Sequence, residues 1–160
     1  METVGYVMEL AAKAGSVVIL NPAPAEEIPS HFLKNISIIT PNESEAALLT
    51  QIDPSQHNEI YQFFSTRGVK STVITLGKKG AYFATDDDRG DVPAFNVKPI
   101  DTTAAGDAFN AGLAVATSEG YLLRDASRFA NAVGALSVTK MGAQPSMPKR
   151  RDVEEFLRTK

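Results

Sequence analysis

Cysteine does not occur anywhere in the 160-residue sequence. Its absence excludes disulfide frameworks, thiolate metal sites and thiol nucleophiles, and it fits a reducing compartment. No apolar run approaches the roughly 20 residues that a membrane-spanning helix needs. Residues 1–5 include an acidic side chain and lack the basic segment and long apolar stretch of a secretory signal. We therefore expect a cytoplasmic protein without a membrane partner.

An excess of basic charge is also missing. Sixteen basic and nineteen acidic residues give a net charge of -3, so no positive field would attract nucleic acid or an anionic membrane surface. Any phosphate site must then be local. With 43% hydrophobic and 22% charged residues, the composition is that of a globular protein, and the length predicts a single domain over residues 1–160.

Short apolar runs rich in β-branched residues alternate with segments of helical periodicity. Strands are expected at 17–20, 36–39 and 71–76, and helices at 3–14, 42–49 and 57–67. This alternation predicts an α/β fold with a mostly parallel sheet covered on both faces. The second half of the chain predicts a hairpin of 81–84 and 92–95 around the turn 86–90, then helices at 105–119, 123–140 and 151–158.

The segment Asp101–Asp107 follows the strand-like residues 95–100 and opens a helix of small residues. The small side chains at Ala104, Ala105 and Gly106 would let backbone amides approach a ligand closely. A helix N-terminus carries unpaired donors and a partial positive charge, so this geometry suits phosphate. The segment is not a Gly-x-x-x-x-Gly-Lys-Ser/Thr loop, which disfavours a P-loop enzyme.

Asp107 lies in the first turn of that predicted helix. Its carboxylate could accept a proton from an attacking hydroxyl, which is the general-base role in phosphoryl transfer to an alcohol. The alternative is that Asp107 only complements the helix dipole, while the small residues permit close helix packing. The residues alone leave both interpretations open.

Four segments are separated along the chain: Asn21–Ala25, Thr40–Glu45, Asp101–Asp107 and Gly142–Ser146. Their sequences, their order and their rough spacing resemble those of the PfkB family of carbohydrate and nucleoside kinases, to which ribokinase belongs. The resemblance implies a three-layer α/β/α ribokinase-like fold with a central, mostly parallel sheet. It covers nearly all of this chain but only the carboxy-terminal half of the family fold. It therefore implies that the amino-terminal half, with its Gly-Gly sugar-binding segment and β-sheet lid, is missing here.

The resemblance assigns roles to several of these residues. It makes Asp107 the catalytic base that contacts the substrate hydroxyl, and it makes the Ala104–Gly106 backbone the anion hole over the γ-phosphate. It places Asn42 and Glu45 near the phosphates of Mg-ATP, with Glu45 acting on Mg²⁺ chiefly through water. The alternative for Asn42 and Glu45 is a helix capping box, and both interpretations can hold together.

The resemblance also implies nucleotide contacts at a turn after the predicted strand 71–76 and at one helical position: Thr75, Gly77, Lys78, Lys79, Gly80 and Asn131. Taken alone, the Gly-Lys-Lys-Gly turn is more often a solvated hairpin. A helical asparagine alone is more often exposed or locally bonded.

Family members use a monovalent cation, usually K⁺, beside the anion hole. The resemblance places six oxygen ligands around it: the Asp101 carboxylate, the backbone oxygens of Thr103, Ser137, Lys140 and Gly142, and the Ser146 hydroxyl. For each residue alone, an ordinary loop or turn is the simpler interpretation.

The resemblance thus implies an ATP-dependent sugar kinase with ATP, Mg²⁺ and K⁺ as cofactors and ribose as the leading substrate. The alternatives are a nucleotide-binding remnant or partner subunit without turnover of its own, and a related sugar or nucleoside kinase. A sheet lacking its other half would expose an edge, through which the chain would self-associate or pair with another chain.

Overall fold

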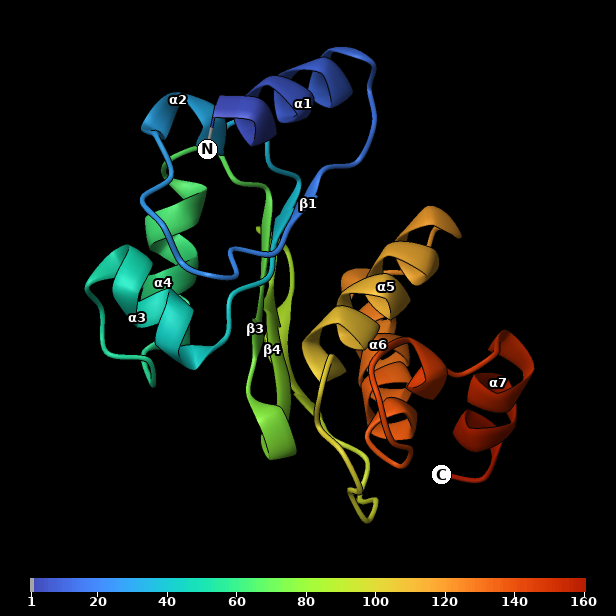
Figure 1. The fold of residues 1–160 in the computed structure, drawn as a ribbon. Coiled ribbons are helices and arrows are strands. Elements are labelled where there is room, and N and C mark those ends of the chain that lie inside the picture. The colour runs from blue at the N-terminus through green and yellow to red at the C-terminus, as the bar shows by residue number, and fades with distance from the viewer. Residues whose placement is uncertain (1) are drawn as a thin grey trace. The chain divides into compact units, whose positions relative to one another are not determined.

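The structure is a computed structural model that describes residues 2–160, and it is an α/β fold (Figure 1). Its elements are α1 (Glu2–Lys13), β1 (Ile19–Leu20), α2 (Ser30–Leu33), β2 (Ile38–Ile39), α3 (Glu43–Thr50), α4 (His57–Ser65), β3 (Ser71–Thr75), the 3-10 turn η1 (Gly77–Lys79), β4 (Gly80–Ala84), β5 (Arg89–Pro93), α5 (Ala105–Ser118), α6 (Leu123–Ser137), the 3-10 turn η2 (Gln144–Ser146) and α7 (Arg150–Arg158). None of the described helices combines the length and apolarity that crossing a lipid bilayer requires.

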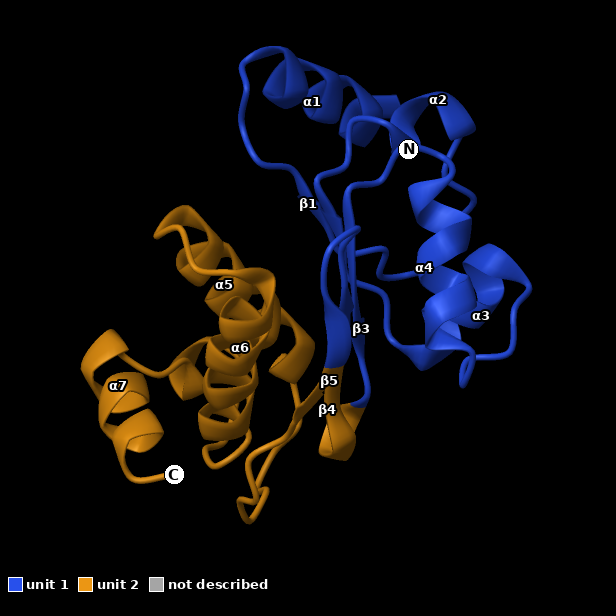
Figure 2. Cartoon of the chain, turned by 180° about the vertical axis from the view of Figure 1, so that it is seen from behind, with its two compact units in different colours: residues 1–76, 82–90 blue, residues 77–81, 91–160 orange. Residues whose placement is uncertain are grey.

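The chain divides into two compact units (Figure 2). Unit 1 runs to Leu76 and includes Tyr82–Gly90, and unit 2 consists of Gly77–Ala81 and Asp91–Lys160. The two units are described separately below. The expectation of a single domain over residues 1–160 stays a prediction.

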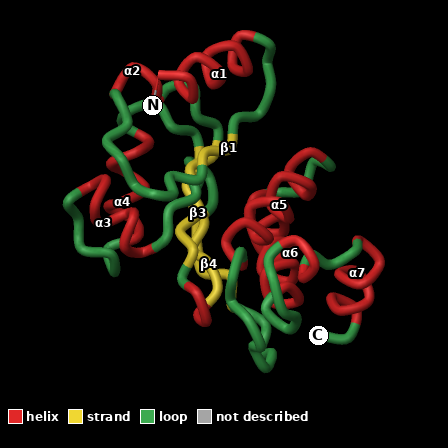
Figure 3. The backbone as a smooth tube through the Cα atoms, in the orientation of Figure 1, coloured by secondary structure: helices red, strands yellow, loops and turns green. Residues whose placement is uncertain are grey.

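The five strands form one sheet in the order β1-β2-β3-β4-β5. Strand β2 pairs in parallel with β1, where Ile19 is opposite Ile38, and with β3, where Ile38 is opposite Ser71. The short connections from β3 to β4 and from β4 to β5 permit only antiparallel pairing, so the sheet is mixed. Figure 3 shows how short β1 is beside β3 and β4.

The core of unit 1 lies where α3 and α4 pack against β3. Ile39, Ile60 and Ile74 are fully buried there, and Phe64 is almost so. Each such side chain contributes about 1.5–3 kcal/mol by leaving water. The amphipathic spacing of Ile60 and Phe64 is what brings α4 onto the strand, as the sequence predicts.

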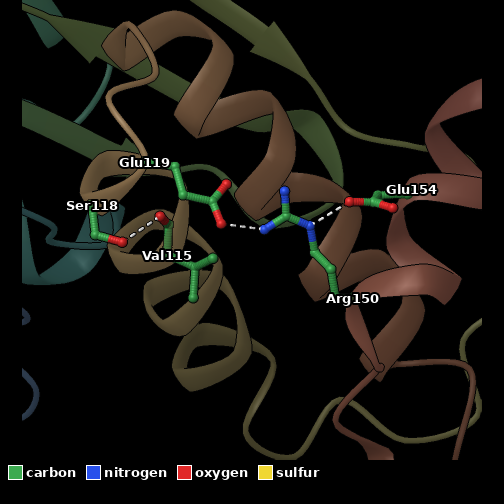
Figure 4. Close-up of polar contacts among 5 residues, drawn as sticks. All are labelled: Val115, Ser118, Glu119, Arg150 and Glu154. Carbon is green, nitrogen blue, oxygen red and sulfur yellow. Dashed lines mark hydrogen bonds and ion pairs between the residues drawn. The ribbon is translucent and has the colours of Figure 1, made fainter.

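Unit 2 is built on the close packing of α5 against α6. Gly112 makes this approach possible, because an added Cβ would lie 2.8 Å from Cγ2 of Val133 and 3.1 Å from Cα of Ala130. Gly120, with φ of 81°, ends α5 as expected. Figure 4 shows Arg150 at the start of α7 between Glu119, just after α5, and Glu154.

Most predicted elements are confirmed within one to four residues, but one prediction needs correction. Residues 95–100 form no strand; instead the amides of Ile100 and Asp101 both donate to the carbonyl oxygen of Val138, at 2.7 and 3.2 Å. Pro99 has no amide to give to a ladder, which weakens a strand there. The predicted helix 123–140 ends at Ser137, and the short α2 was not predicted.

Candidate active site

The entrance of α5 is the centre of the candidate site, and it lies in unit 2. Ala104 precedes the helix with φ of 59°, a left-handed conformation that is uncommon for a residue with a side chain. The amide of Ala105 donates to the carbonyl of Thr102 at 3.2 Å, so this tight turn leads directly into the helix. No side chain caps α5, which leaves the next amides of its first turn, those of Gly106 and Asp107, available to a ligand.

Gly106 and Asp107 follow in the first turn of α5, and both are exposed. No heavy atom lies within 4 Å of the position that a Cβ on Gly106 would take. The helix therefore begins with open space beside its amides, together with an accessible carboxylate on Asp107. This combination of donors, partial positive charge and a base can hold an oxyanion and deprotonate a neighbouring alcohol.

Asp101 ties the loop before α5 to the loop after α6. Its Oδ1 accepts a hydrogen bond from the amide of Thr103 at 2.9 Å, and its Oδ2 accepts one from the amide of Gly142 at 2.8 Å. These backbone donors, that of Thr103 foremost, lower the pKa of Asp101, so its carboxylate is ionised at neutral pH. The negative charge thus sits at the start of the Asp101–Asp107 segment.

The other residues predicted to hold a cation lie in the same part of unit 2. The carbonyl of Ser137 accepts the amide of Lys140 at 3.2 Å, and the Ser146 hydroxyl donates to the carbonyl of Ala143 at 2.7 Å. Ser137 and Ser146 are both buried. The ionised Asp101 and these carbonyl and hydroxyl oxygens are the hard donors that an alkali cation takes.

Asn42 and Glu45 lie in unit 1 and form the capping box of α3. The Asn42 side chain accepts from the Glu45 amide at 2.9 Å, and Glu45 Oε2 accepts from the Asn42 amide at 2.8 Å. Thr75 lies beside them, since it is bridged to Asn42 and its amide donates to the carbonyl of Pro41 at 3.0 Å. The structure thus brings these three predicted residues together at the carboxyl end of β3.

The predicted nucleotide turn takes the form of η1. Gly77, Lys78 and Lys79 are exposed, and the carbonyl of Lys79 accepts the amide of Ala94 at 3.2 Å. Gly80 has φ of 109°, and a Cβ there would collide with the carbonyl oxygen of Val92. The turn is therefore fixed by its backbone.

Asn131 lies in α6, but it is neither exposed nor locally bonded. Its Nδ2 donates to the carbonyls of Val92 and Pro93 at 3.0 and 3.3 Å, and only 8% of the residue is exposed. The side chain joins α6 to the end of β5. Two hydrogen-bond acceptors near the entrance of α5 could not be predicted from the sequence: the carbonyls of Thr102 and Val138. Every residue has a backbone carbonyl, so residue type gives no signal for them.

Fold and site together define an α/β protein with a helix entrance suited to phosphate and a carboxylate beside it. The family model of the pfkB family of carbohydrate kinases matches residues 2–150. The chain belongs to this family.

Curated relatives agree with this assignment. The chain is 41% identical to ribokinase from Haemophilus influenzae over 152 residues, which cover 93% of this chain and 50% of that protein. It is 39% identical to ribokinase from Bacillus subtilis, covering 98% of this chain and 51% of the relative. The chain therefore spans about half the length of the curated relatives that it matches.

Solved structures show the same relationship. Ribokinase from Arabidopsis thaliana, complexed with ribose and ATP, has a TM-score of 0.88 and 34% identity over 96% of this chain and 51% of that one. Ribokinase from Thermotoga maritima has a TM-score of 0.83 and 38% identity, over 92% of this chain and 51% of its own. The fold is that of about half a ribokinase.

Proposed function

We propose that the chain is the ATP-binding and phosphoryl-transfer portion of a ribokinase, which converts ATP and D-ribose to ADP and D-ribose 5-phosphate. The observation that carries this proposal is the entrance of α5, where uncapped first-turn amides and the exposed Asp107 lie together. The identity of about 40% to ribokinases supports the substrate.

In this mechanism Asp107 takes the proton of the ribose hydroxyl, and the resulting oxygen attacks the γ-phosphorus of ATP. The bond from that phosphorus to the bridging oxygen breaks, and ADP leaves with the electron pair. The first-turn amides of α5 donate hydrogen bonds to the phosphoryl oxygens. These fixed donors and the positive end of the helix dipole stabilise the negative charge on those oxygens. Asp107 acts as a base only in its ionised form, and after the transfer it returns to that form by releasing the substrate's proton to water.

Mg²⁺ would be held mainly by the phosphates and by water. Among residues 2–160 there is no group of three His, Cys, Asp or Glu side chains that could form a metal cage, and Mg²⁺ in phosphate sites commonly uses few protein ligands. The carboxylate of Glu45, fixed by the Asn42 amide, fits such an indirect role. When bound, Mg²⁺ would neutralise charge that develops on the phosphate oxygens.

K⁺ would be held by Asp101 with the oxygens of Thr103, Ser137, Lys140, Gly142 and Ser146. The fit rests on the donor set, which is all oxygen and includes one ionised carboxylate. Asp101 already links the segment before α5 to Gly142, so a cation there would stiffen the backbone whose amides face the phosphate.

Two further candidate functions rest on specific observations. The chain spans about half of each relative, which favours a nucleotide-binding subunit that needs a partner for turnover. Deoxyribokinase from Salmonella typhi is 34% identical over 98% of this chain, which favours a related sugar, deoxyribose, as the second candidate substrate.

The experiment combines calorimetry with an activity assay. Mg-ADP should bind with and without K⁺, and more tightly with it. Ribose phosphorylation should fall by about 10²–10⁴-fold in Asp107→Asn, since a general base contributes that much. Asp125→Asn is the matched control, because Asp125 is an exposed acid in the first turn of α6.

Each outcome separates the candidates. Turnover that survives Asp107→Asn removes Asp107 from the proposed role. ADP binding without turnover in the wild-type chain supports the partner-dependent subunit. Faster turnover of deoxyribose than of ribose supports the related kinase.

A further inference from the structure

Asn110 lies in α5, one helical turn beyond Gly106. Its Nδ2 donates a hydrogen bond to the carbonyl oxygen of Gly106 at 3.0 Å. In an α-helix the same oxygen also accepts the backbone amide four residues later, which is again that of Asn110. A carbonyl oxygen has two lone pairs, so both bonds can form together. Two donors from one residue therefore hold this carbonyl.

This carbonyl belongs to the same peptide unit as the amide of Asp107. The unit is planar, and in its trans form the C=O and N–H bonds point in opposite directions. The amide of Ala105 is already bonded to the carbonyl of Thr102, whereas no side chain caps the amide of Asp107. A bond that holds the carbonyl end of the unit therefore also sets the direction of the N–H at its other end.

We propose that Asn110 is a positioning residue for phosphate binding, acting through the peptide unit between Gly106 and Asp107. The inference rests on the proposed function, in which the first-turn amides of α5 hold the γ-phosphate. Glycine leaves its backbone more freedom than any other residue, so the plane of this peptide unit needs a restraint that Gly106 does not supply. Asn110 supplies it, and its bond polarises the unit, which makes the N–H of Asp107 a stronger donor.

Helix stability does not account for an asparagine at this position. Asparagine is a poorer helix former than alanine, because its side chain competes for backbone hydrogen bonds. Gly106 is exposed, so loss of the Asn110 side chain does not leave a buried carbonyl without a partner. Asn110→Ala should therefore leave the free energy of unfolding unchanged or raise it, while it weakens the interaction with phosphate.

The test is calorimetric titration of the chain with Mg²⁺ and either β,γ-imido ATP or ADP. Cooperative strengthening of about 10–30% in a charge-assisted bond, together with the lost restraint, predicts an affinity about two- to fivefold lower for the ATP analogue in Asn110→Ala. The affinity for ADP, which has no γ-phosphate, should change less. Asn110→Ser should recover most of the loss, because a serine hydroxyl can donate to the carbonyl four residues earlier.

Ser118→Ala is the matched control in the last turn of α5 (Figure 4). The Ser118 hydroxyl donates to the carbonyl of Val115 at 2.7 Å, so this variant deletes a bond of the same kind at the other end of the helix. Its affinity for both nucleotides should equal that of the wild type. In the free chain, the carbonyl ¹³C resonance of Gly106 should shift in Asn110→Ala and return in Asn110→Ser, a readout that needs no ligand.

The possible failures are distinguishable. Equal affinity of the wild type and Asn110→Ala for the ATP analogue would overturn the positioning role and leave the proposed function standing. An equal loss for ADP and the analogue, a loss that Asn110→Ser does not recover, or a lower melting temperature of Asn110→Ala would each show that the side chain only supports the fold. If the wild-type chain does not bind the analogue, the proposed phosphate site fails and this inference fails with it.

Discussion

The substitution Gly106→Ala separates the folding role of the α5 entrance from its role with phosphate. No heavy atom lies within 4 Å of the added Cβ, and Gly106 has an ordinary helical backbone, so alanine fits. Alanine is the better helix former by about 0.8–1.0 kcal/mol in a helix interior, with less effect in a first turn. The free energy of unfolding should therefore stay the same or rise slightly.

The same methyl group should weaken binding of a triphosphate. In the proposed mechanism the first-turn amides of α5 hold the γ-phosphate, and the added methyl would stand in the space beside them. Losing one charge-assisted hydrogen bond costs about 1.5–3 kcal/mol. This corresponds to an affinity loss of about tenfold to 150-fold.

The assay is calorimetric titration with Mg²⁺ and either β,γ-imido ATP or ADP. The loss should be larger for the ATP analogue, because ADP has no γ-phosphate. Gly90→Ala is the control, since Gly90 belongs to β5 and not to the entrance of α5, and its Cβ would meet its nearest atom, Cε1 of Phe83, at 3.8 Å, which is ordinary contact. Unchanged affinity of Gly106→Ala for the analogue, or an equal loss for ADP, would refute the reasoning.

Other predictions concern stability. Gly112→Ala should lower the free energy of unfolding by about 1–2 kcal/mol in urea, because overpacking against Val133 outweighs the gain in helix propensity; a stabilised variant would contradict this close approach. Asn131→Ala should lower the free energy of unfolding by about 1–3 kcal/mol, since it leaves the carbonyls of Val92 and Pro93 without this donor; a change below about 0.5 kcal/mol would show that those bonds contribute little. Burial, with a 2.6 Å hydrogen bond to Asp86, raises the pKa of Tyr61 to about 12, so its neutral form is favoured in the folded chain. Its contribution to stability should be intact below pH 10 and fall between pH 10 and about 12, and Tyr61→Phe should remove that fall in thermal melts at stepped pH.

Local signals in the sequence were sufficient to predict the longer helices and the capping box. Asn42 and Glu45 are three residues apart, so their reciprocal bonds follow from spacing alone. The end of α5 at Gly120 was predictable because glycine takes the left-handed conformation without strain. These features need no knowledge of the rest of the fold.

Contacts between distant segments could not be predicted in this way. Asp101 meets Gly142 across 41 positions, and Asn131 meets Val92 across 39. Residues 95–100 have the composition of a strand, but a strand needs a neighbour, and Val138 supplies only one carbonyl. The division of the predicted site between two units is likewise a property of contacts and not of motifs.

The most direct test of phosphate binding by the first-turn amides of α5 is an amide NMR titration of the ¹⁵N-labelled chain with Mg²⁺ and β,γ-imido ATP. The account predicts large shifts for the amides of Gly106 and Asp107, and smaller shifts at these two residues with ADP. Shifts confined to other parts of the chain, with both amides unmoved at saturation, would contradict it.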